Sequence, residues 1–134
     1  MNKINSVVLV DDDTTTNYVN QLLLEDLDVT HQILIAHNGE EALELISGNC
    51  ENGYCPQLIL LDINMPVMNG FEFMEAYQRL ASKHKQSVVV VMLTTSLNPG
   101  DVKRLQEVPI NGFLNKPLTE DKVRALLKQH FGLD

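Results

Sequence analysis

Four strand-like runs in this sequence are each followed by a polar residue, and this pattern constrains the fold more than any other feature. Three of the runs, residues 7–10, 58–61 and 88–93, are continuously apolar, as is typical of parallel strands covered on both faces. The fourth is the more mixed run 112–115. The residues that follow them in turn are Asp11 and Asp12, Asp62, Thr94, and Lys116. Because the carboxyl ends of parallel strands meet at one edge of a sheet, we expect these side chains to form a single site.

Stretches with helical spacing of apolar residues follow the strand-like runs. Their apolar positions are Tyr18, Val19, Leu22, Leu23 and Leu27; Ala42, Leu45 and Ile46; Phe73, Met74, Tyr77, Leu80 and Ala81; and Val123, Leu126, Leu127 and Phe131. Asn38, Asn69 and Thr119 are placed to cap three of these helices, with Glu41 completing a capping box after Asn38. A short fourth helix is predicted from Pro99 to before Pro109, and Gly132 ends the fifth.

Alternating strands and helices predict an α/β fold. With residues 32–36 as a further, more mixed strand, the pattern is (βα)5, which favours a doubly wound, five-stranded parallel sheet with the flavodoxin-like strand order 2-1-3-4-5. The mixed runs 32–36 and 112–115 suit the two edges. This order brings the polar strand ends around one crevice.

The length of 134 residues, 44% of them hydrophobic, predicts one domain over residues 1–134 with a packed core at about 6–131. Residues 1–5 are expected to be a disordered lead, and residues 48–56 a surface insertion between the second helix and the third strand. No output domain is expected.

The formal charge of −8 argues against direct binding of nucleic acid or an anionic membrane. The sequence shows no secretory signal, and no apolar stretch approaches the roughly 18 residues that a membrane span needs. We therefore expect a cytoplasmic protein. In such a compartment Cys50 and Cys55 favour free thiols over a short loop disulfide, although a disulfide is geometrically possible.

Carboxylates gathered at one crevice repel one another, and a bound divalent cation relieves that repulsion. Asp11, Asp12 and Asp62 offer hard oxygen ligands of the kind that Mg²⁺ prefers. With Mg²⁺ present, Lys116 and the Thr94 hydroxyl fit a phosphoryl-transfer site in which Asp62 is the nucleophile.

The chain resembles the receiver domains of two-component response regulators, including the single-domain chemotaxis type, from Val7 to about Phe131. The motifs that carry the resemblance are LVDDD at 9–13, LLDINMPVMNG at 60–70, LTTS at 93–96 and GFLNKPL at 112–118. Each motif is weak alone, but their order and spacing together are specific.

The resemblance implies that Asp62 accepts a phosphoryl group from the phosphohistidine of a sensor histidine kinase or phosphotransfer protein. It also implies that Asp11, Asp12, Asp62 and the backbone carbonyl of Asn64 hold Mg²⁺, and that the Lys116–Pro117 bond is cis. Thr94 and Phe113 would form a switch that remodels the face of the fourth helix, fifth strand and fifth helix. Such a protein is a signalling phosphoprotein rather than an enzyme.

Other interpretations remain open at this point. An aspartate-nucleophile phosphatase also phosphorylates an Asp beside Mg²⁺, but it usually carries a second Asp where this sequence has Asn64. A receiver-like module that binds without being phosphorylated is a second alternative, and retention of all five site groups argues against it. A flavin-binding flavodoxin analogue is disfavoured because no hydroxyl-rich phosphate loop follows the first strand. Residues 14–16 come closest, but the two carboxylates before them would repel a phosphate. Phe113 could equally be plain packing on an edge strand.

Overall fold

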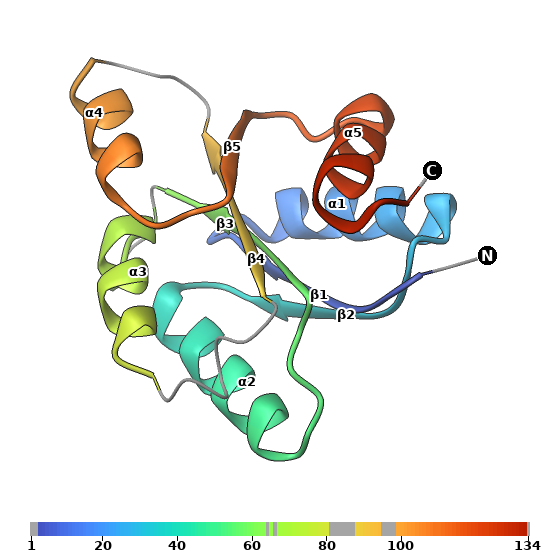
Figure 1. Ribbon diagram of the computed structural model, residues 1–134, viewed down its shortest axis with the longest axis horizontal. Coiled ribbons are helices and arrows are strands. Elements are labelled where there is room, and N and C mark those ends of the chain that lie inside the picture. Colours follow the sequence, from blue (N-terminus) through green and yellow to red (C-terminus); the bar gives the residue numbers. More distant parts are fainter. Residues whose placement is uncertain (1–2, 64, 66, 81–87, 95–98, 134) are drawn as a thin grey trace.

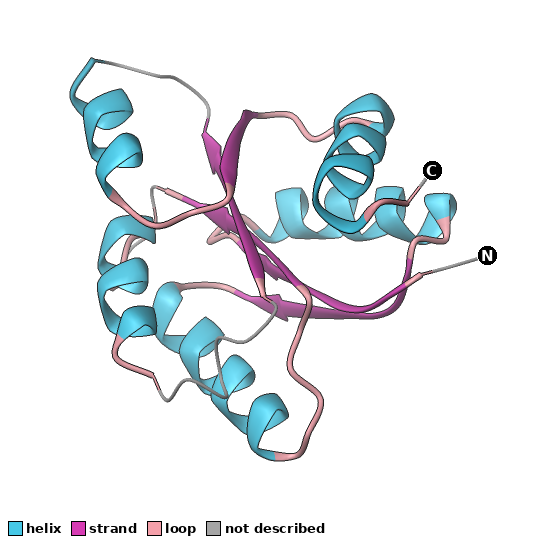
Figure 2. Cartoon of the chain, viewed as in Figure 1, coloured by secondary structure: helices cyan, strands magenta, loops and turns pink. Residues whose placement is uncertain are grey.

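A computed structural model describes residues 3–63, 65, 67–80, 88–94 and 99–133 of the chain. Strands and helices alternate along these residues, as the sequence pattern predicts (Figures 1 and 2). The strands are β1 (Ile4–Val10), β2 (Thr30–Ala36), β3 (Leu58–Asp62), β4 (Val89–Thr94) and β5 (Gly112–Asn115). The helices are α1 (Thr14–Leu27), α2 (Gly39–Glu51), α3 (Gly70–Gln78), α4 (Pro99–Glu107) and α5 (Glu120–Phe131).

The strands form one sheet in the order β2-β1-β3-β4-β5, and every neighbouring pair is parallel. This confirms the predicted fold class and strand order, with β2 and β5 at the edges. Figure 1 shows α1 and α5 on one face of the sheet and α2, α3 and α4 on the other. The carboxyl ends of β1, β3 and β4 therefore lie side by side at one edge of the sheet.

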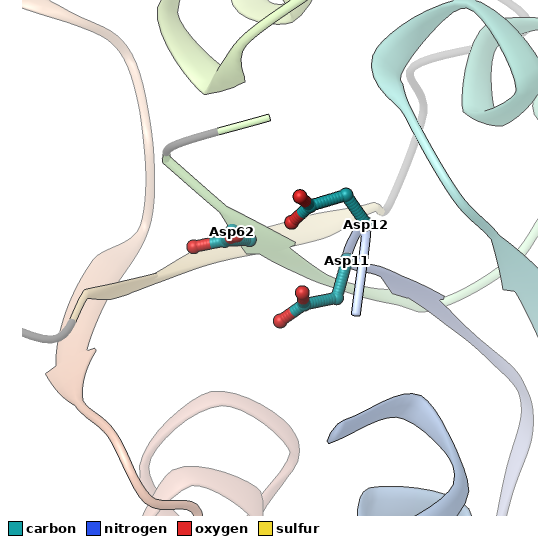
Figure 3. Close-up of side chains that lie close together, drawn as sticks. All are labelled: Asp11, Asp12 and Asp62. Carbon is teal, nitrogen blue, oxygen red and sulfur yellow. The ribbon is translucent and has the colours of Figure 1, made fainter. Parts of the chain in front are cut away.

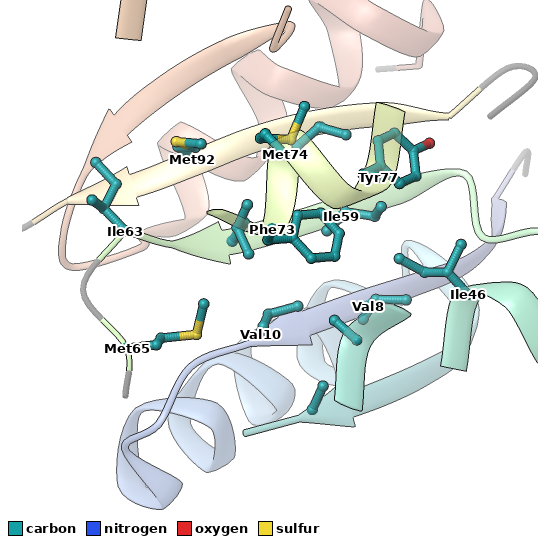
Figure 4. Close-up of a cluster of buried hydrophobic side chains, with 14 of the residues drawn as sticks. Val8, Val10, Ile46, Ile59, Ile63, Met65, Phe73, Met74, Tyr77 and Met92 are labelled. Carbon is teal, nitrogen blue, oxygen red and sulfur yellow. The ribbon is translucent and has the colours of Figure 1, made fainter. Parts of the chain in front are cut away.

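Two apolar clusters fill the space between the sheet and its helices. Alternate residues of a strand point to opposite faces, so Val8 and Val10 enter one cluster while Val7 and Leu9 enter the other. The first cluster includes Phe73, Met74 and Tyr77 of α3 (Figure 4), which confirms these positions of the predicted apolar stripe. Leu80 packs against the cluster beyond the end of α3, and Ala81 lies outside the described residues.

The predicted helix caps are largely confirmed. Asn69 and Glu72 form a complete capping box at the start of α3, and Thr119 accepts a hydrogen bond from the Lys122 N–H at the start of α5. At α2 only half of the expected box forms. Asn38 accepts from the Glu41 N–H, but the Glu41 carboxylate accepts from the backbone N–H of His37 rather than that of Asn38.

Two predicted boundaries are wrong. Strand β1 begins at Ile4, and the Ile4 N–H donates to the Val29 carbonyl, so residues 1–5 are not all a disordered lead. Helix α2 continues to Glu51, so the first four residues of the expected 48–56 insertion are helical. The real connection to β3 is correspondingly short.

Helix α1 is confirmed, and Leu23, Leu24 and Leu27 pack into the core, but the rest of its predicted apolar stripe does not. Tyr18, Val19 and Leu22 are exposed, whereas Asn17 and Asn20 are buried beneath the helix. Among the helices that the structure describes, none has the length and apolarity needed to cross a bilayer.

The interpretation of Cys50 and Cys55 as free thiols is wrong. The two cysteines form a disulfide, with their Cα atoms 4.1 Å apart. We expected free thiols because a reducing compartment disfavours disulfides, and that expectation took no account of the local geometry. The chain turns back directly after α2, where the Tyr54 N–H donates to the Asn49 carbonyl, and this turn brings the two side chains together.

Candidate functional site

Three carboxylates converge at the carboxyl ends of β1 and β3. Oxygens of Asp11, Asp12 and Asp62 all lie within 4.8 Å of one another, and Figure 3 shows the three side chains gathered at these two strand ends. Asp11 and Asp62 are buried, whereas Asp12 is exposed. The cluster is therefore anchored in the protein and open on one side.

Lys116 supplies the positive charge beside this cluster. Its ammonium group lies 2.6 Å from Asp11 Oδ2 and 3.2 Å from Asp62 Oδ1. Burial alone would lower the pKa of Lys116, but the hydrogen bond to Asp11 and the charge of Asp62 outweigh burial and raise the pKa above its usual value. Lys116 is thus held in its charged form between two carboxylates.

Asp11 is fixed by the turn that follows β1. Its Oδ1 accepts from the Asp13 N–H at 2.9 Å, and its backbone carbonyl accepts from Asn17 Nδ2 at 2.9 Å. Asp13 itself caps α1, where hydrogen bonds from the Thr16 hydroxyl and the Thr15 N–H lower the pKa of its carboxyl group. The sequence pattern did not point to Asn17 as a residue of this site.

The chain beyond Asp62 is held close to the start of α3. The Ile63 N–H donates to the Leu93 carbonyl, and the Gly70 N–H donates to the Ile63 carbonyl at 2.8 Å. A Cβ atom on Gly70 would lie 2.9 Å from the backbone oxygen of Asp62, so only glycine permits this close approach. Asn64, which we expected to offer a backbone carbonyl to the metal, lies outside the described residues.

Thr94 and Phe113 occupy the two strands beyond β3. Thr94 is buried at the carboxyl end of β4, one residue past the partner of Asp62 in the β3–β4 register, and its carbonyl accepts from the Lys116 N–H. Phe113 lies on edge strand β5 with 41% of its surface exposed. Its ring lines a groove of about 490 Å³ between β5 and α5. The Lys116–Pro117 bond is cis, as the resemblance implied.

Residues 7–128 match the family model of the response regulator receiver domain. The chain belongs to this family. Receiver domains are signal-transduction modules of two-component systems, and the match runs from within β1 to within α5. The family assignment made from the sequence motifs is confirmed.

Relatives with this domain come from distant organisms and differ in length. The chain is 30% identical to two-component response regulator 24 of Arabidopsis thaliana, over 91% of this chain and 81% of that protein. It is 34% identical to hybrid signal transduction histidine kinase B of Dictyostelium discoideum over 96% of this chain, but it spans only 7% of that protein. The second likeness therefore concerns one domain of a much longer protein.

Solved structures show the same receiver fold. A two-component response regulator from Cytophaga hutchinsonii superposes with a TM-score of 0.88 at 27% identity, covering 98% of this chain and 99% of that one. A chemotaxis response regulator from Vibrio cholerae gives a TM-score of 0.78 at 29% identity, covering 96% and 100%. The strand order and helix layers of this receiver domain are thus those of its solved relatives.

The donor set of this receiver domain fits a hard divalent cation. All three candidate ligands are carboxylates, which suit Mg²⁺ better than zinc, and Asp12 is accessible from solvent. Outside the stretches that the structure leaves undescribed, no other group of acidic, histidine or cysteine side chains has ligand spacing. The acidic cluster is therefore the candidate metal site.

Proposed function

We propose that this receiver domain accepts a phosphoryl group on Asp62 from the phosphohistidine of a sensor histidine kinase or a phosphotransfer protein. The observation that supports this most directly is the grouping of Asp62 with Asp11, Asp12 and Lys116 at one sheet edge. The chain then acts as a phosphoprotein in a two-component phosphorelay, without catalytic turnover of its own.

In the proposed transfer, an oxygen of Asp62 attacks phosphorus as the bond from phosphorus to the imidazole nitrogen breaks. The imidazole leaves with the bonding electron pair and takes a proton from solvent, so no acid on the receiver is needed. Lys116 stabilises the negative charge of the phosphoryl oxygens from its position 3.2 Å from Asp62. Asp62 is rigidly held because it is the last residue of a fully buried strand.

Asp11, Asp12 and Asp62 are the side chains that would hold Mg²⁺, with the Asn64 carbonyl as a further proposed ligand. A bound Mg²⁺ would neutralise charge on the transferring group and orient its oxygens. Asp11 suits a ligand role because its backbone and its carboxylate are both fixed by hydrogen bonds.

The proposed output is a change in the face formed by α4, β5 and α5. Thr94 would donate a hydrogen bond to the phosphoryl group, and Phe113 would turn inward from its half-exposed position. Phe113 carries no hydroxyl, so this movement would be driven by packing rather than by a tyrosine hydrogen bond. Downstream partners on this face are expected to be proteins.

A phosphatase that turns over phosphate esters is a weaker candidate. Such an enzyme needs an acid and base next to its nucleophile, and the residue two positions after Asp62 is the neutral Asn64. A receiver that binds partners without being phosphorylated would have no need of the ion pair between Lys116 and Asp11, because burying two charges is costly.

The proposal is tested by incubating the protein with Mg²⁺ and acetyl phosphate and measuring its intact mass. We expect one phosphoryl group on the wild type and none on Asp62→Asn, because the amide is not a nucleophile under these conditions. Equal loading of the variant would contradict the assignment of Asp62.

Asp26→Asn is a matched control, since Asp26 is an exposed carboxylate on α1 and its loss should leave loading unchanged. Release of many equivalents of phosphate from an ester substrate would instead favour the phosphatase.

A further inference from the structure

The disulfide between Cys50 and Cys55 lies at the end of the molecule opposite the phosphoryl site. Cys50 is in the last turn of α2, and Cys55 precedes Pro56, Gln57 and the start of β3. Strand β3 carries the chain from this end to Asp62, a path of roughly 13 Å at the usual rise per residue. The disulfide is therefore not part of the acidic site.

The loop that the disulfide closes is also held by its own backbone. The Asn52 N–H donates to the Gly48 carbonyl, the Gly53 N–H to the Cys50 carbonyl, and the Tyr54 N–H to the Asn49 carbonyl at 2.8 Å. These bonds would keep the two sulfurs close together even as thiols. The disulfide can therefore open and re-form without unfolding of α2.

The chain on the far side of the loop is anchored independently. Pro56 is buried, the Gln57 N–H donates to the Ser6 carbonyl, and the Val89 N–H donates to the Gln57 carbonyl. Any movement after reduction would be confined to the residues between the end of α2 and Pro56. The sheet, and with it Asp62, would stay in place.

The two sulfurs differ in accessibility. Cys50 is only 8% exposed and packs into the core cluster with Ile46, whereas Cys55 lies at the edge of that cluster and is partly exposed. Residues 51–54 are all exposed around it, and Tyr54 is 73% exposed. A thiol in solution can therefore reach Cys55 more easily than Cys50.

We propose that Cys50 and Cys55 are a second covalent modification site, which exchanges reversibly with dithiols of the small-molecule or thioredoxin-like class. A thiolate of the dithiol attacks Cys55 Sγ, the bond to Cys50 Sγ breaks, and the Cys50 thiolate takes a proton from solvent. The second thiol of the reductant then displaces Cys55, which is also protonated. The dithiol is oxidised to a disulfide, and the protein gains two electrons and two protons.

The consequence is a receiver domain with two independent covalent states. One is the phosphorylation of Asp62 under the proposed function. The other is the redox state of Cys50 and Cys55, which sets whether the loop that presents Tyr54 is cross-linked or open. Reduction would loosen a surface that carries an exposed aromatic side chain while the acidic site stays assembled.

The first test compares reduction by dithiothreitol in native buffer and in denaturant, followed by alkylation and intact mass. We expect the native rate to fall within about tenfold of the denatured rate, since attack needs no unfolding. We also expect the reduced protein to keep its circular dichroism and its loading of Asp62. A larger retardation, or unfolding upon reduction, would overturn the proposal and make the disulfide purely structural.

The second test uses Cys50→Ala and Cys55→Ala, each with oxidised glutathione. Cys55, the only thiol in the first variant, should form a mixed disulfide at least about tenfold faster than Cys50 does in the second, because Cys50 is buried. Equal rates, or the reverse order, would overturn the assignment of Cys55 as the point of attack. The double variant Cys50→Ser/Cys55→Ser should load Asp62 as the wild type does, which separates this proposal from the proposed phosphoryl function.

Discussion

Burial acts differently on two polar groups of this protein. At Lys116, the carboxylates of Asp11 and Asp62 outweigh the effect of burial on its pKa. At Tyr77, burial is the only cause of the shift and raises the pKa of the phenol to about 12. The Tyr77 hydroxyl is buried and has no hydrogen-bond partner within the structure as described. Lys116 is thus a charged group of the acidic site, whereas the buried Tyr77 hydroxyl lowers the stability of the fold.

Tyr77→Phe should therefore stabilise the protein by about 1 kcal/mol at neutral pH, because it removes a buried hydroxyl that lacks a partner. The folded state also favours the protonated phenol more strongly than the unfolded state does. The stability gained from this preference is fully present below pH 10, the usual pKa of tyrosine, and is lost as the pH rises toward 12. Between pH 7 and 11 the wild type should lose about 1 kcal/mol more stability than the variant. Urea unfolding at both pH values measures this, and parallel losses in the two proteins would contradict it.

At the scale of elements, the start of α3 packs closely against the end of β3. The Asn69 capping box sets the first turn of α3, and Gly70 lets the helix approach the backbone of Asp62. The geometry of Asp62 therefore depends on a residue that has no side chain. Two glycines of this protein allow a direct comparison, since Gly70 is crowded and Gly48 is not.

Gly70→Ala should destabilise the protein by about 2 kcal/mol, because a Cβ atom 2.9 Å from the Asp62 carbonyl forces the backbone to shift. It should also slow loading of Asp62. Gly48→Ala is the matched control. Apart from its chain neighbours and the backbone of α2, nothing lies within 4 Å of the place that a Cβ atom on Gly48 would take, and the change should stabilise the protein by about 0.5 to 1 kcal/mol. Thermal unfolding and intact mass test both variants, and equal effects would refute the account.

The sequence predicted the elements and the strand order well because its apolar runs and caps are unambiguous. It predicted the convergence of Asp11, Asp12, Asp62 and Lys116 because parallel strands share one edge. It did not predict that Tyr18, Val19 and Leu22 of α1 are exposed while Asn17 and Asn20 are buried. Hydrophobicity alone selects Tyr18 and its neighbours, whereas the helix buries Asn17 to satisfy a backbone carbonyl beside the site.

Asn17 and Asn20 are three residues apart and therefore lie on one face of the helix. That spacing could have predicted a buried polar face on α1. The disulfide could not be deduced from the spacing of two cysteines, since that spacing is equally compatible with free thiols. The boundaries of β1 and α2 also depend on backbone hydrogen bonds that no local pattern encodes.

At the scale of the whole molecule, the acidic cluster concentrates repulsion in a chain that already carries a formal charge of −8. A cation that binds only the folded state relieves this repulsion and raises stability by mass action. For a metal at 100 times its dissociation constant the gain is about 2.7 kcal/mol.

Asp12→Asn should therefore be more stable than the wild type in a chelator, and it should gain at least about 1.4 kcal/mol less from Mg²⁺, which corresponds to a tenfold loss of affinity. Thermal unfolding with and without Mg²⁺ measures both effects. Glu44→Gln, which removes one exposed charge from α2, should respond to Mg²⁺ as the wild type does. An unchanged response in Asp12→Asn would remove Asp12 from the metal site.

The ion pair between Asp11 and Lys116 joins residues 105 positions apart. Asp62 leaves the ribosome well before Lys116 does, so an unfinished chain holds the acceptor carboxylate but not the cation beside it. Under the proposed function, such a chain would be a poor substrate for the kinase until β5 has docked on β4. The ability to carry a signal would then report that the sheet is fully assembled.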